Sequence, residues 1–445
     1  MTEQNLDVDK LPEFKKFEKE NKVFSLEINQ IPVWERVRKQ IYDKVRFNNT
    51  NRSQDTDTEL VNTLKRIYLM NRNIIIRNPY ISGNYDILVY GTGRREIEPN
   101  GKWWDIYFDP LYEGGLDDYM HLEQPHDAFH YSPIQTNVFK YTDLIRYLSG
   151  VVMKSGLKSP SIPSNLQNEL INIEKQLEYK FNVEIDLRTM VHNELYSRKI
   201  KYILYKRLVS KIEPEILIIE CSYGKETLIE VAKSSGIPVI ELQHGTIHNH
   251  NLGYSYENSS KRMFPDYLFV WGEFWKQWAD IPLPDERIIP TGYPYLYQKK
   301  KGLENVDDRN RIIFISQDTI GKKLSELALS IEQDTELNND IVYKLHPKEY
   351  GVWKAKYPKL IESDIDVIGN DGPSLYELFS KSNIQIGVYS TALFEGLTFE
   401  LETYIYKIPG WKRVERLISK GYAKGVSSSD ELLNLIEQQD SNKRN

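Results

Sequence analysis

Two stretches of this 445-residue chain alternate short apolar runs with amphipathic segments, and this alternation constrains the fold more than any other feature. In the first stretch, residues 215–220, 225–235 and 239–243 read as strand, helix and strand. A strand, a helix and a second strand within about 30 residues are typical of a parallel sheet with a right-handed crossover. Residues 265–271 then read as a further strand, so the pattern predicts more than one such unit.

The second stretch repeats the alternation after a charged segment over residues 298–310, which we interpret as a linker. Its apolar runs predict strands at residues 311–316, 340–345, 364–368, 384–389 and 402–407. We therefore predict an α/β protein with two Rossmann-like, doubly wound domains that face each other across a cleft. The expected domains are residues 1–297 and residues 298–445, since 445 residues exceed one ordinary core.

The first part of the chain predicts a helical extension rather than a sheet. Residues 31–42 place Pro32 near a helix start and put Val33, Val37 and Ile41 on one face. Polar residues dominate 48–58, which reads as a loop. Further helices are expected within the segments 134–152 and 164–200.

Composition excludes several classes of protein. The net charge is −6, so no basic field points to nucleic acid. The single cysteine, Cys221, excludes an internal disulfide and fits a reducing compartment. The N-terminus lacks the apolar core of a signal peptide, and no apolar run approaches the ~20 residues of a spanning helix. We expect a cytoplasmic protein, with contact at the inner face of the membrane as an alternative through basic residues 299–301 and 412–413. The oligomeric state is not indicated.

Polar residues follow three of the predicted strands at the point where each strand ends. They are Gln243-His244-Gly245, His346-Pro347 and Ser390-Thr391. Open parallel sheets bind ligands at the carboxyl edge of their strands, so these residues are candidate site residues. Ser390 and Thr391 also stand at a predicted helix start, where hydroxyls and N–H groups suit a phosphate. An N-cap role for either residue is the alternative interpretation.

Two further strand ends carry charged candidates. Glu220 follows the strand over residues 215–220 and is a candidate acceptor contact or alternative base, while the adjacent Cys221 reads as a small buried residue. Arg94 and Arg95 close the Gly-rich turn after residues 85–90 and are candidates for binding an anionic substrate. An ordinary strand-to-helix turn explains the same residues equally well.

Histidines gather in two places, and neither predicts a metal site. His121, His126 and His130 accompany Glu123 and Asp127, but no third-ligand motif supports them, so surface histidines are the default interpretation.

The second group consists of His244, His248 and His250 in a polar turn. Zinc is again not favoured there. We predict no metal site in this chain.

The motifs at residues 243–245, 344–347 and 389–395, in this order, resemble GT-B glycosyltransferases of bacterial capsule and cell-wall polymer synthesis. The likeness extends over about residues 213–411. The enzymes that the chain resembles include polysialyltransferases, Kdo transferases of capsule assembly and CDP-glycerol glycerophosphotransferases. Polysialyltransferases carry an acidic-acidic-Gly motif before the His-Pro motif, whereas here Asn370-Asp371-Gly372 follows it, which speaks against a sialyl donor.

The resemblance implies roles for individual residues. His244 would be the general base that takes the proton of an acceptor hydroxyl, and Gln243 and Gly245 would contact substrate. His346, beside Pro347, would contact the donor phosphate with help from Lys344. Glu395 would hold the ribose hydroxyls. For each, an ordinary role in a capped turn or a helix end remains the alternative.

The resemblance also implies the reaction. We expect an inverting, metal-independent glycosyltransferase that moves a sugar from a nucleotide-sugar donor to a capsular glycan or glycolipid, with no cofactor besides that co-substrate. The alternatives are a polyol-phosphate transferase of the CDP-glycerol type, a non-hydrolysing sugar-nucleotide 2-epimerase and a non-catalytic nucleotide-sugar-binding protein.

Overall fold

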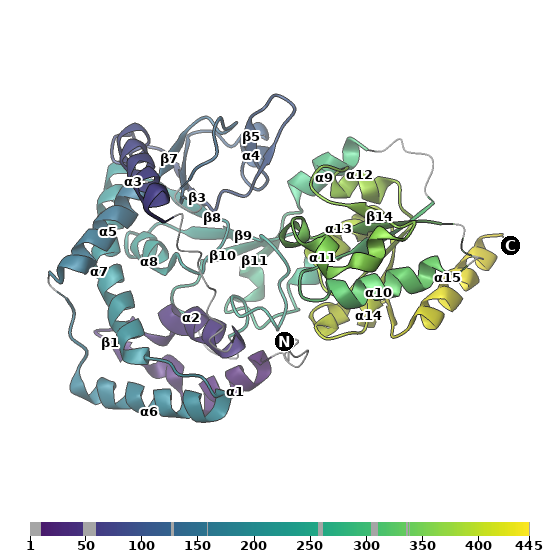
Figure 1. The fold of residues 1–445 in the computed structure, drawn as a ribbon. Helices are drawn as coiled ribbons and strands as arrows, with labels where there is room; N and C mark the ends of the chain where they lie inside the picture. Colours follow the sequence, from purple (N-terminus) through teal and green to yellow (C-terminus); the bar gives the residue numbers. More distant parts are fainter. Residues whose placement is uncertain are drawn as a thin grey trace. The chain divides into compact units, whose positions relative to one another are not determined.

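A computed structural model describes residues 10–47, 59–125, 129–157, 159–256, 261–303, 310–334, 337 and 339–444. The chain divides into two compact units, Lys10–Pro294 and Tyr295–Asn445 (Figure 1). The loop expected over residues 48–58 and part of the expected linker, residues 304–309, lie outside the described residues.

The N-terminal unit is built on a seven-stranded parallel sheet with the order β11-β10-β9-β8-β3-β6-β7. Its strands are β3 (Ile87–Gly91), β6 (Tyr119–Glu123), β7 (Phe139–Tyr141), β8 (Ile216–Ile219), β9 (Val239–Leu242), β10 (Tyr267–Val270) and β11 (Ile288–Pro290). In chain order, β3, β6 and β7 extend the sheet toward one edge, and β8, β9, β10 and β11 extend it toward the other edge. The order therefore reverses between β3 and β8, which is the topological switch point of a doubly wound sheet.

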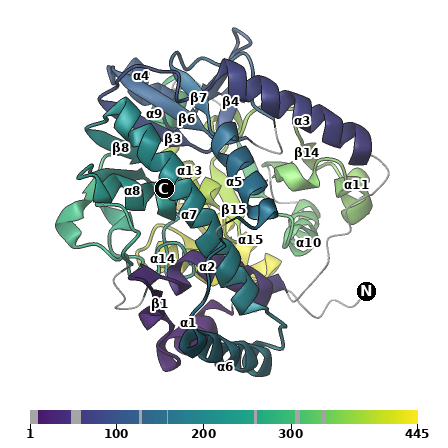
Figure 2. The same ribbon diagram turned by 90° about the vertical axis from the view of Figure 1, so that its left-hand side faces the viewer.

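Helices cover the sheet because its strands are apolar on both faces. Leu88 and Leu217 pack on one face against α5 (Asp143–Ser155), α7 (Leu187–Ile212) and α8 (Glu226–Ser234), while Val89 and Ile218 pack on the other with Phe108. Figure 2 shows α5 and α7 side by side, and they contact each other. Burial of each such Leu or Ile side chain stabilises the fold by about 1.5–3 kcal/mol.

A second, mainly helical core is formed largely by the start of the chain. It joins α1 (Leu11–Glu20), α2 (Trp34–Phe47), the start of α7 and α6 (Ser164–Phe181) through buried apolar side chains, and a small hairpin, β1 (Glu27–Ile28) and β2 (Ile31–Pro32), connects α1 to α2. The expected helix after Pro32 is confirmed, and Val33, Val37 and Ile41 are all buried as its spacing predicted. The helix α3 (Glu59–Ile76) completes the helical extension.

Between β3 and β6 the chain makes an antiparallel hairpin, β4 (Arg95–Ile97) and β5 (Trp103–Asp105), followed by the short helix α4 (Asp109–Glu113). This hairpin is a separate two-stranded sheet and is not a member of the seven-stranded sheet.

The C-terminal unit contains a six-stranded parallel sheet with the order β14-β13-β12-β15-β16-β17. Its strands are β12 (Arg311–Ile315), β13 (Asp340–Lys344), β14 (Asp366–Ile368), β15 (Ile384–Gly387), β16 (Glu402–Tyr406) and β17 (Lys424–Val426). This is the same winding as in the N-terminal unit, with a switch point between β12 and β15. Two doubly wound, Rossmann-like sheets confirm the α/β class and the Rossmann-like character predicted for each half.

The helices of the C-terminal unit are α10 (Gly321–Glu332), α11 (Trp353–Lys356), α12 (Leu375–Ser380), α13 (Thr391–Thr398), α14 (Glu415–Ser419) and α15 (Ser429–Arg444), after α9 (Pro294–Lys301) at the junction of the units. A capping box begins α12, because the Ser374 hydroxyl accepts from the Glu377 N–H and the Glu377 carboxylate accepts from the Ser374 N–H. The core lies between these helices and the apolar strands β12, β13 and β15.

Some elements differ from the sequence prediction. The segment 134–152 contains the edge strand β7 before α5, so a helix from residue 134 was wrong. The strands β6, β11 and β17 were missed. Buried β6 carries His121 and Glu123, and their polarity hid its apolar neighbours from a pattern that looks for uninterrupted apolar runs.

Candidate functional site

The switch point of the N-terminal sheet holds a buried carboxylate. Glu220 follows β8 and accepts hydrogen bonds from the Thr92 backbone N–H at 2.9 Å and from the Thr92 hydroxyl at 2.5 Å, across from the end of β3. Arg94 Nε lies 3.8 Å from the same carboxylate, and the Arg94 side chain is 55% exposed. Glu220 is thus fixed in place, while Arg94 presents a cation at the sheet edge where an anionic substrate would bind.

His244 follows β9, the strand next to β8. Its backbone carbonyl accepts hydrogen bonds from Arg94 Nη1 at 3.2 Å and from the Tyr107 hydroxyl at 2.8 Å. The structure therefore brings together three predicted residues, Arg94, Glu220 and His244, at one edge of the sheet. Arg94 comes from a turn more than a hundred residues before the other two in sequence.

Both ring nitrogens of His244 have tyrosine partners. Tyr223 Oη lies 2.9 Å from Nε2, and Tyr254 Oη lies 3.2 Å from Nδ1. Burial lowers the pKa of His244 to about 3, and the positive charges of Arg94 and Lys225 act in the same direction. The imidazole is therefore neutral at physiological pH, which is the form that can accept a proton.

The lowered pKa of His244 has a consequence for stability that can be measured. The unfolded chain binds a proton on this histidine below its ordinary pKa of 6.5, whereas the folded chain does not until about pH 3. Stability is therefore lost as the pH falls through this window, and one such group contributes a slope of about 1.4 kcal/mol per pH unit. We expect His244→Gln to remove that slope from the free energy of unfolding, measured by denaturant titrations between pH 4 and 6. An unchanged slope would contradict the buried neutral state.

The other candidates near this edge have structural partners. Gln243 is buried and spans the ends of two strands, because its Nε2 donates to the Gly245 carbonyl and its Oε1 accepts from the Trp271 N–H, each at 2.8 Å. A Cβ at Gly245 would meet no atom within 4 Å, so the backbone there is open to a ligand. Cys221 is buried, and burial raises the pKa of its thiol to about 12, in keeping with the expected inert residue.

Arg95 lies on the opposite side of its strand from Arg94. Its guanidinium is fully buried and bonds to Glu123, with Nη2 2.7 Å and Nε 2.8 Å from Oε2, and to the Thr136 hydroxyl. Asp109 lies 3.7 Å away. This ion-pair network anchors the β4–β5 hairpin to the sheet, so we keep Arg94, and not Arg95, as a substrate-binding candidate.

The histidines near β6 are buried, and the default interpretation of surface histidines was wrong. His121 is fully buried beside the Tyr112 hydroxyl, and burial lowers its pKa to about 3. His130 lies between Glu123 and Asp143, at 3.2 Å and 2.8 Å. Burial alone would lower the pKa of His130, but the hydrogen bonds to these two carboxylates raise it. The third histidine, His126, lies outside the described residues.

The second histidine group is also partly structural, since His248 is buried and its Nδ1 accepts from the His250 N–H at 3.1 Å. Across the described part of the chain, no three His, Cys, Asp or Glu side chains gather in a way that could hold a metal ion.

The switch point of the C-terminal sheet lies where β12 and β15 end. Ser390 caps α13 there, and its hydroxyl accepts from the Ala392 N–H at 3.2 Å. Tyr389 hydrogen-bonds to Thr319, which follows β12, and Arg413 lies over the Tyr389 ring at 4.5 Å. The start of α13, with Ser390 and Thr391, thus has the strand-edge position at which a phosphate group is bound in folds of this winding.

His346 follows β13, the neighbour of β12. Its Nδ1 accepts from the Lys348 N–H at 3.2 Å, so the neutral ring carries its proton on Nε2 as a donor. Burial lowers the pKa of His346, and Lys348 adds to this effect. The buried carboxylate of Glu349 fixes the turn by accepting from the His346 N–H at 2.7 Å and from the Ser316 hydroxyl at 2.9 Å.

Three remaining candidates surround these residues. Lys344 is half-buried, and its ammonium group donates to the Gly369 carbonyl at 2.8 Å, so it has a structural partner. Glu395 accepts from the Tyr376 hydroxyl at 3.1 Å, one turn into α13. Pro347 is exposed and begins the short 3-10 helix Pro347–Glu349, of which His346 is the N-cap residue.

Several residues of both sites were not predicted from the sequence, although two of them carried a signal that could have found them. Glu349 lies three residues after His346, which is the spacing of a capping box. The signal for Glu241 was a charged residue within the otherwise apolar strand β9. Tyr107, Tyr223 and Tyr254 carried no signal in a chain with 30 tyrosines.

Comparisons with known proteins show likeness in structure alone. No protein-family model matches the chain, and no curated protein matches it. A UDP-GlcNAc 2-epimerase from Methanocaldococcus jannaschii is 11% identical, with a TM-score of 0.47 over 79% of this chain and 91% of that one. MurG from Acinetobacter baumannii is 11% identical, with a TM-score of 0.43 over 80% and 90%. The wall teichoic acid polymerase TagF is 13% identical, with a TM-score of 0.35 over 78% and 79%. Such values show neither a family nor an activity.

Among the helices that the structure describes, none combines the length and the apolar character needed to span a membrane.

Proposed function

We propose that the chain is a GT-B glycosyltransferase, which moves a sugar from a nucleotide-activated donor to a hydroxyl of a surface glycan or glycolipid. One observation carries the proposal: each of two identically wound sheets places a histidine at its carboxyl edge, close to the switch point. The N-terminal unit would bind the acceptor and the C-terminal unit the donor nucleotide.

The protonation of the two histidines supports different roles for them. His244 is neutral and can accept the proton of the acceptor hydroxyl, whose oxygen then forms the new bond to the anomeric carbon. His346 presents an Nε2–H donor, suited to a phosphate oxygen. The bond from the anomeric carbon to that phosphate breaks, and the leaving nucleotide keeps the electron pair. The N–H groups at the start of α13 add positive potential for the diphosphate, so no protein-bound metal is required.

Aromatic side chains at the N-terminal edge favour a sugar acceptor. The rings of Trp271 and Tyr293 stack with centroids 4.4 Å apart, and Tyr107 lies next to Tyr293 with centroids 6.0 Å apart. Trp271 and Tyr293 are half-buried and follow β10 and β11. Half-buried aromatic side chains at a strand edge are typical of the lining of small-molecule sites.

Nucleotide binding tests the donor half of the proposal. We expect one of CMP, UDP, GDP, dTDP and CDP-glycerol to raise the melting temperature, since a ligand at 100 Kd stabilises the folded state by about 2.7 kcal/mol. His346→Ala should reduce this stabilisation to about 0.3–1.4 kcal/mol, because a lost hydrogen bond to a charged phosphate costs about 1.5–3 kcal/mol, or about 10- to 150-fold in Kd. Thermal denaturation with and without each nucleotide measures both effects.

His192→Ala is the matched control, because His192 bonds to Ser159 on the surface of the N-terminal unit and should leave the shift intact. The donor half of the proposal is wrong if no nucleotide stabilises the wild type, or if His346→Ala responds like the wild type. A response to CDP-glycerol alone would favour a polyol-phosphate transferase, and conversion of a UDP-sugar without any acceptor would favour an epimerase.

A further inference from the structure

His244 is one member of a chain of four hydrogen-bonded side chains. The members are Tyr223, after β8; His244, after β9; Tyr254, in the loop that follows; and Glu241, within β9. Tyr254 Oη lies 2.7 Å from Glu241 Oε1 and 3.2 Å from His244 Nδ1. Glu241 is fully buried, Tyr254 is 1% exposed and His244 is 9% exposed. Water is therefore excluded from the inner part of the chain.

The direction of each hydrogen bond follows from Glu241. Its Oε1 receives both the Ser222 N–H, at 3.2 Å, and the Tyr254 hydroxyl, while Oε2 has no partner. An oxygen that accepts from a backbone N–H remains an acceptor even if the carboxyl group binds a proton, because that proton would sit on Oε2. Tyr254 therefore donates its only proton to Glu241 and accepts from His244 Nδ1–H.

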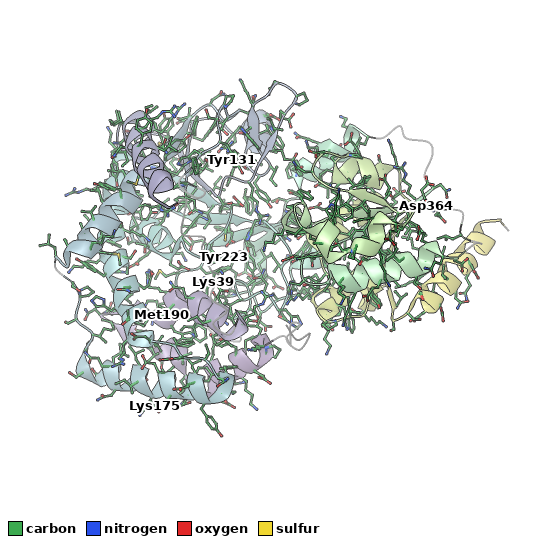
Figure 3. All side chains as sticks on the ribbon, viewed as in Figure 1. Lys39, Tyr131, Lys175, Met190, Tyr223 and Asp364 are labelled. Atoms are coloured by element: carbon green, nitrogen blue, oxygen red, sulfur yellow. The ribbon has the colours of Figure 1, made fainter. Side chains whose placement is uncertain are left out.

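The direction of these hydrogen bonds determines which ring nitrogen of His244 can act as the base. A neutral imidazole with a proton on Nδ1 has its lone pair on Nε2, and the hydroxyl that lies 2.9 Å from Nε2 is that of Tyr223. Tyr223 is half-buried, whereas the rest of the chain is buried (Figure 3, where Tyr223 is labelled). Its ring is also held in place, since a Cβ at Gly253 would lie 2.8 Å from it.

We propose that Glu241 and Tyr254 are positioning residues that hold His244 in the Nδ1–H tautomer, and that Tyr223 is a catalytic residue that passes the acceptor's proton to Nε2. This inference rests on the role proposed for His244 above. As the acceptor oxygen attacks the donor carbon, its proton moves to Tyr223 Oη, and the phenol proton of Tyr223 moves to His244 Nε2. The bond from the donor carbon to the leaving phosphate breaks at the same time, and the imidazolium later releases its proton to water.

The tautomer is tested directly on the folded protein, without any assay of activity. Nitrogen-15 NMR of the full chain, labelled at histidine, distinguishes a protonated ring nitrogen from one with a free lone pair, and the signals absent from His244→Gln identify the residue. We expect a protonated Nδ1 and an unprotonated Nε2 near pH 7. The Glu220 backbone carbonyl also lies near the ring and is the competing acceptor. A proton on Nε2 would overturn the proposal, whatever the variants below do.

Variants separate positioning from mere packing. Tyr254→Phe and Glu241→Leu should abolish the preference for the Nδ1–H tautomer and lower kcat by about 10- to 100-fold, less than the loss of a whole general base. Glu241→Gln keeps an acceptor oxygen for the same two donors and should retain both the tautomer and most of kcat. If Tyr254→Phe folds and keeps the wild-type tautomer, the positioning role is wrong.

Tyr223→Phe tests the proton relay. It should lower kcat to within about 10-fold of His244→Gln, because the proton then lacks a carrier to Nε2, while the thermal shift caused by the nucleotide stays unchanged. Tyr202→Phe, which removes a phenol hydroxyl on α7, is the control and should behave as the wild type. Turnover by Tyr223→Phe at the wild-type rate would show that the acceptor bonds to His244 directly and would overturn the relay. Full activity of His244→Gln would instead refute the role of His244 as the base, on which this inference rests, and would leave the transferase reaction itself in place.

Discussion

His244→Gln is expected to lower kcat by about 100- to 10,000-fold, the contribution of a positioned general base. The glutamine amide can replace one hydrogen bond of the imidazole but cannot take up a proton at neutral pH. The nucleotide-binding residues proposed above lie in the other unit, so the thermal shift caused by the nucleotide should remain. Turnover is measured as release of the nucleotide from the donor in the presence of acceptor.

Two comparisons make this result specific. His192→Gln changes a histidine on α7 that bonds to Ser159, and it should leave kcat unchanged. In the wild type, burial keeps His244 neutral down to about pH 3, so activity should not fall near pH 6.5 through protonation of this residue. A His244→Gln variant with wild-type kcat would refute the role of His244 as the base. A thermal shift in a wild type that shows no turnover would instead indicate a nucleotide-binding protein without transferase activity.

The positions of the candidate residues along the strands could be predicted from the sequence, because an apolar run that ends in a polar turn marks a strand end. His244, His346 and Ser390 were found this way, and each lies directly after a strand of its parallel sheet. The strand order could not be predicted, since each crossover connection can place the next strand at either edge of the sheet. The order explains why Glu220 and Thr92, 128 residues apart, meet at the switch point.

The rest of the site depends on contacts between loops, which carry no periodic signal. Arg94 and Arg95 look equivalent in the sequence, but successive residues of extended chain point to opposite sides, so one reaches the sheet edge and the other a buried carboxylate. Tyr254 is brought to His244 by a loop whose path is set partly by residues from the other end of the unit.

Arg38 sets that path. From α2 in the helical extension, its guanidinium donates to the backbone carbonyls of Leu252, at 2.9 Å, and Ser255, at 3.0 Å, on either side of Tyr254. Its charge is paired with Glu18, with Nε 2.6 Å from Oε1 and Nη2 2.7 Å from Oε2. The Arg38 side chain is 2% exposed and that of Glu18 is 3% exposed, so the pair is held away from water. The helical extension thus supports the loop that carries Tyr254.

Arg38→Met is expected to lower the free energy of unfolding of the N-terminal unit by about 3–5 kcal/mol, because it leaves the Glu18 carboxylate buried without its partner. Glu18→Gln should also lower the free energy of unfolding, since it leaves the charge of the buried Arg38 guanidinium without a carboxylate partner. Denaturant titration monitored by tryptophan fluorescence measures the change, and Trp34 reports on the pair because its Nε1–H donates to Glu18 at 2.6 Å. Where Arg38→Met still folds, kcat should also fall, since Tyr254 loses its support on both sides.

Lys39→Met provides the matched control on the next residue of the same helix. Lys39, labelled in Figure 3, is 55% exposed and pairs with Asp43 at 2.9 Å in the i, i+4 arrangement. An exposed pair of this kind contributes about 0.3–0.5 kcal/mol, so Lys39→Met should change stability by less than about 1 kcal/mol. Equal losses for Arg38→Met and Lys39→Met would mean that the buried pair is not what attaches the helical extension to the loop. A large loss of stability with unchanged kcat in the folded fraction would separate the anchoring of this loop from the chemistry of His244.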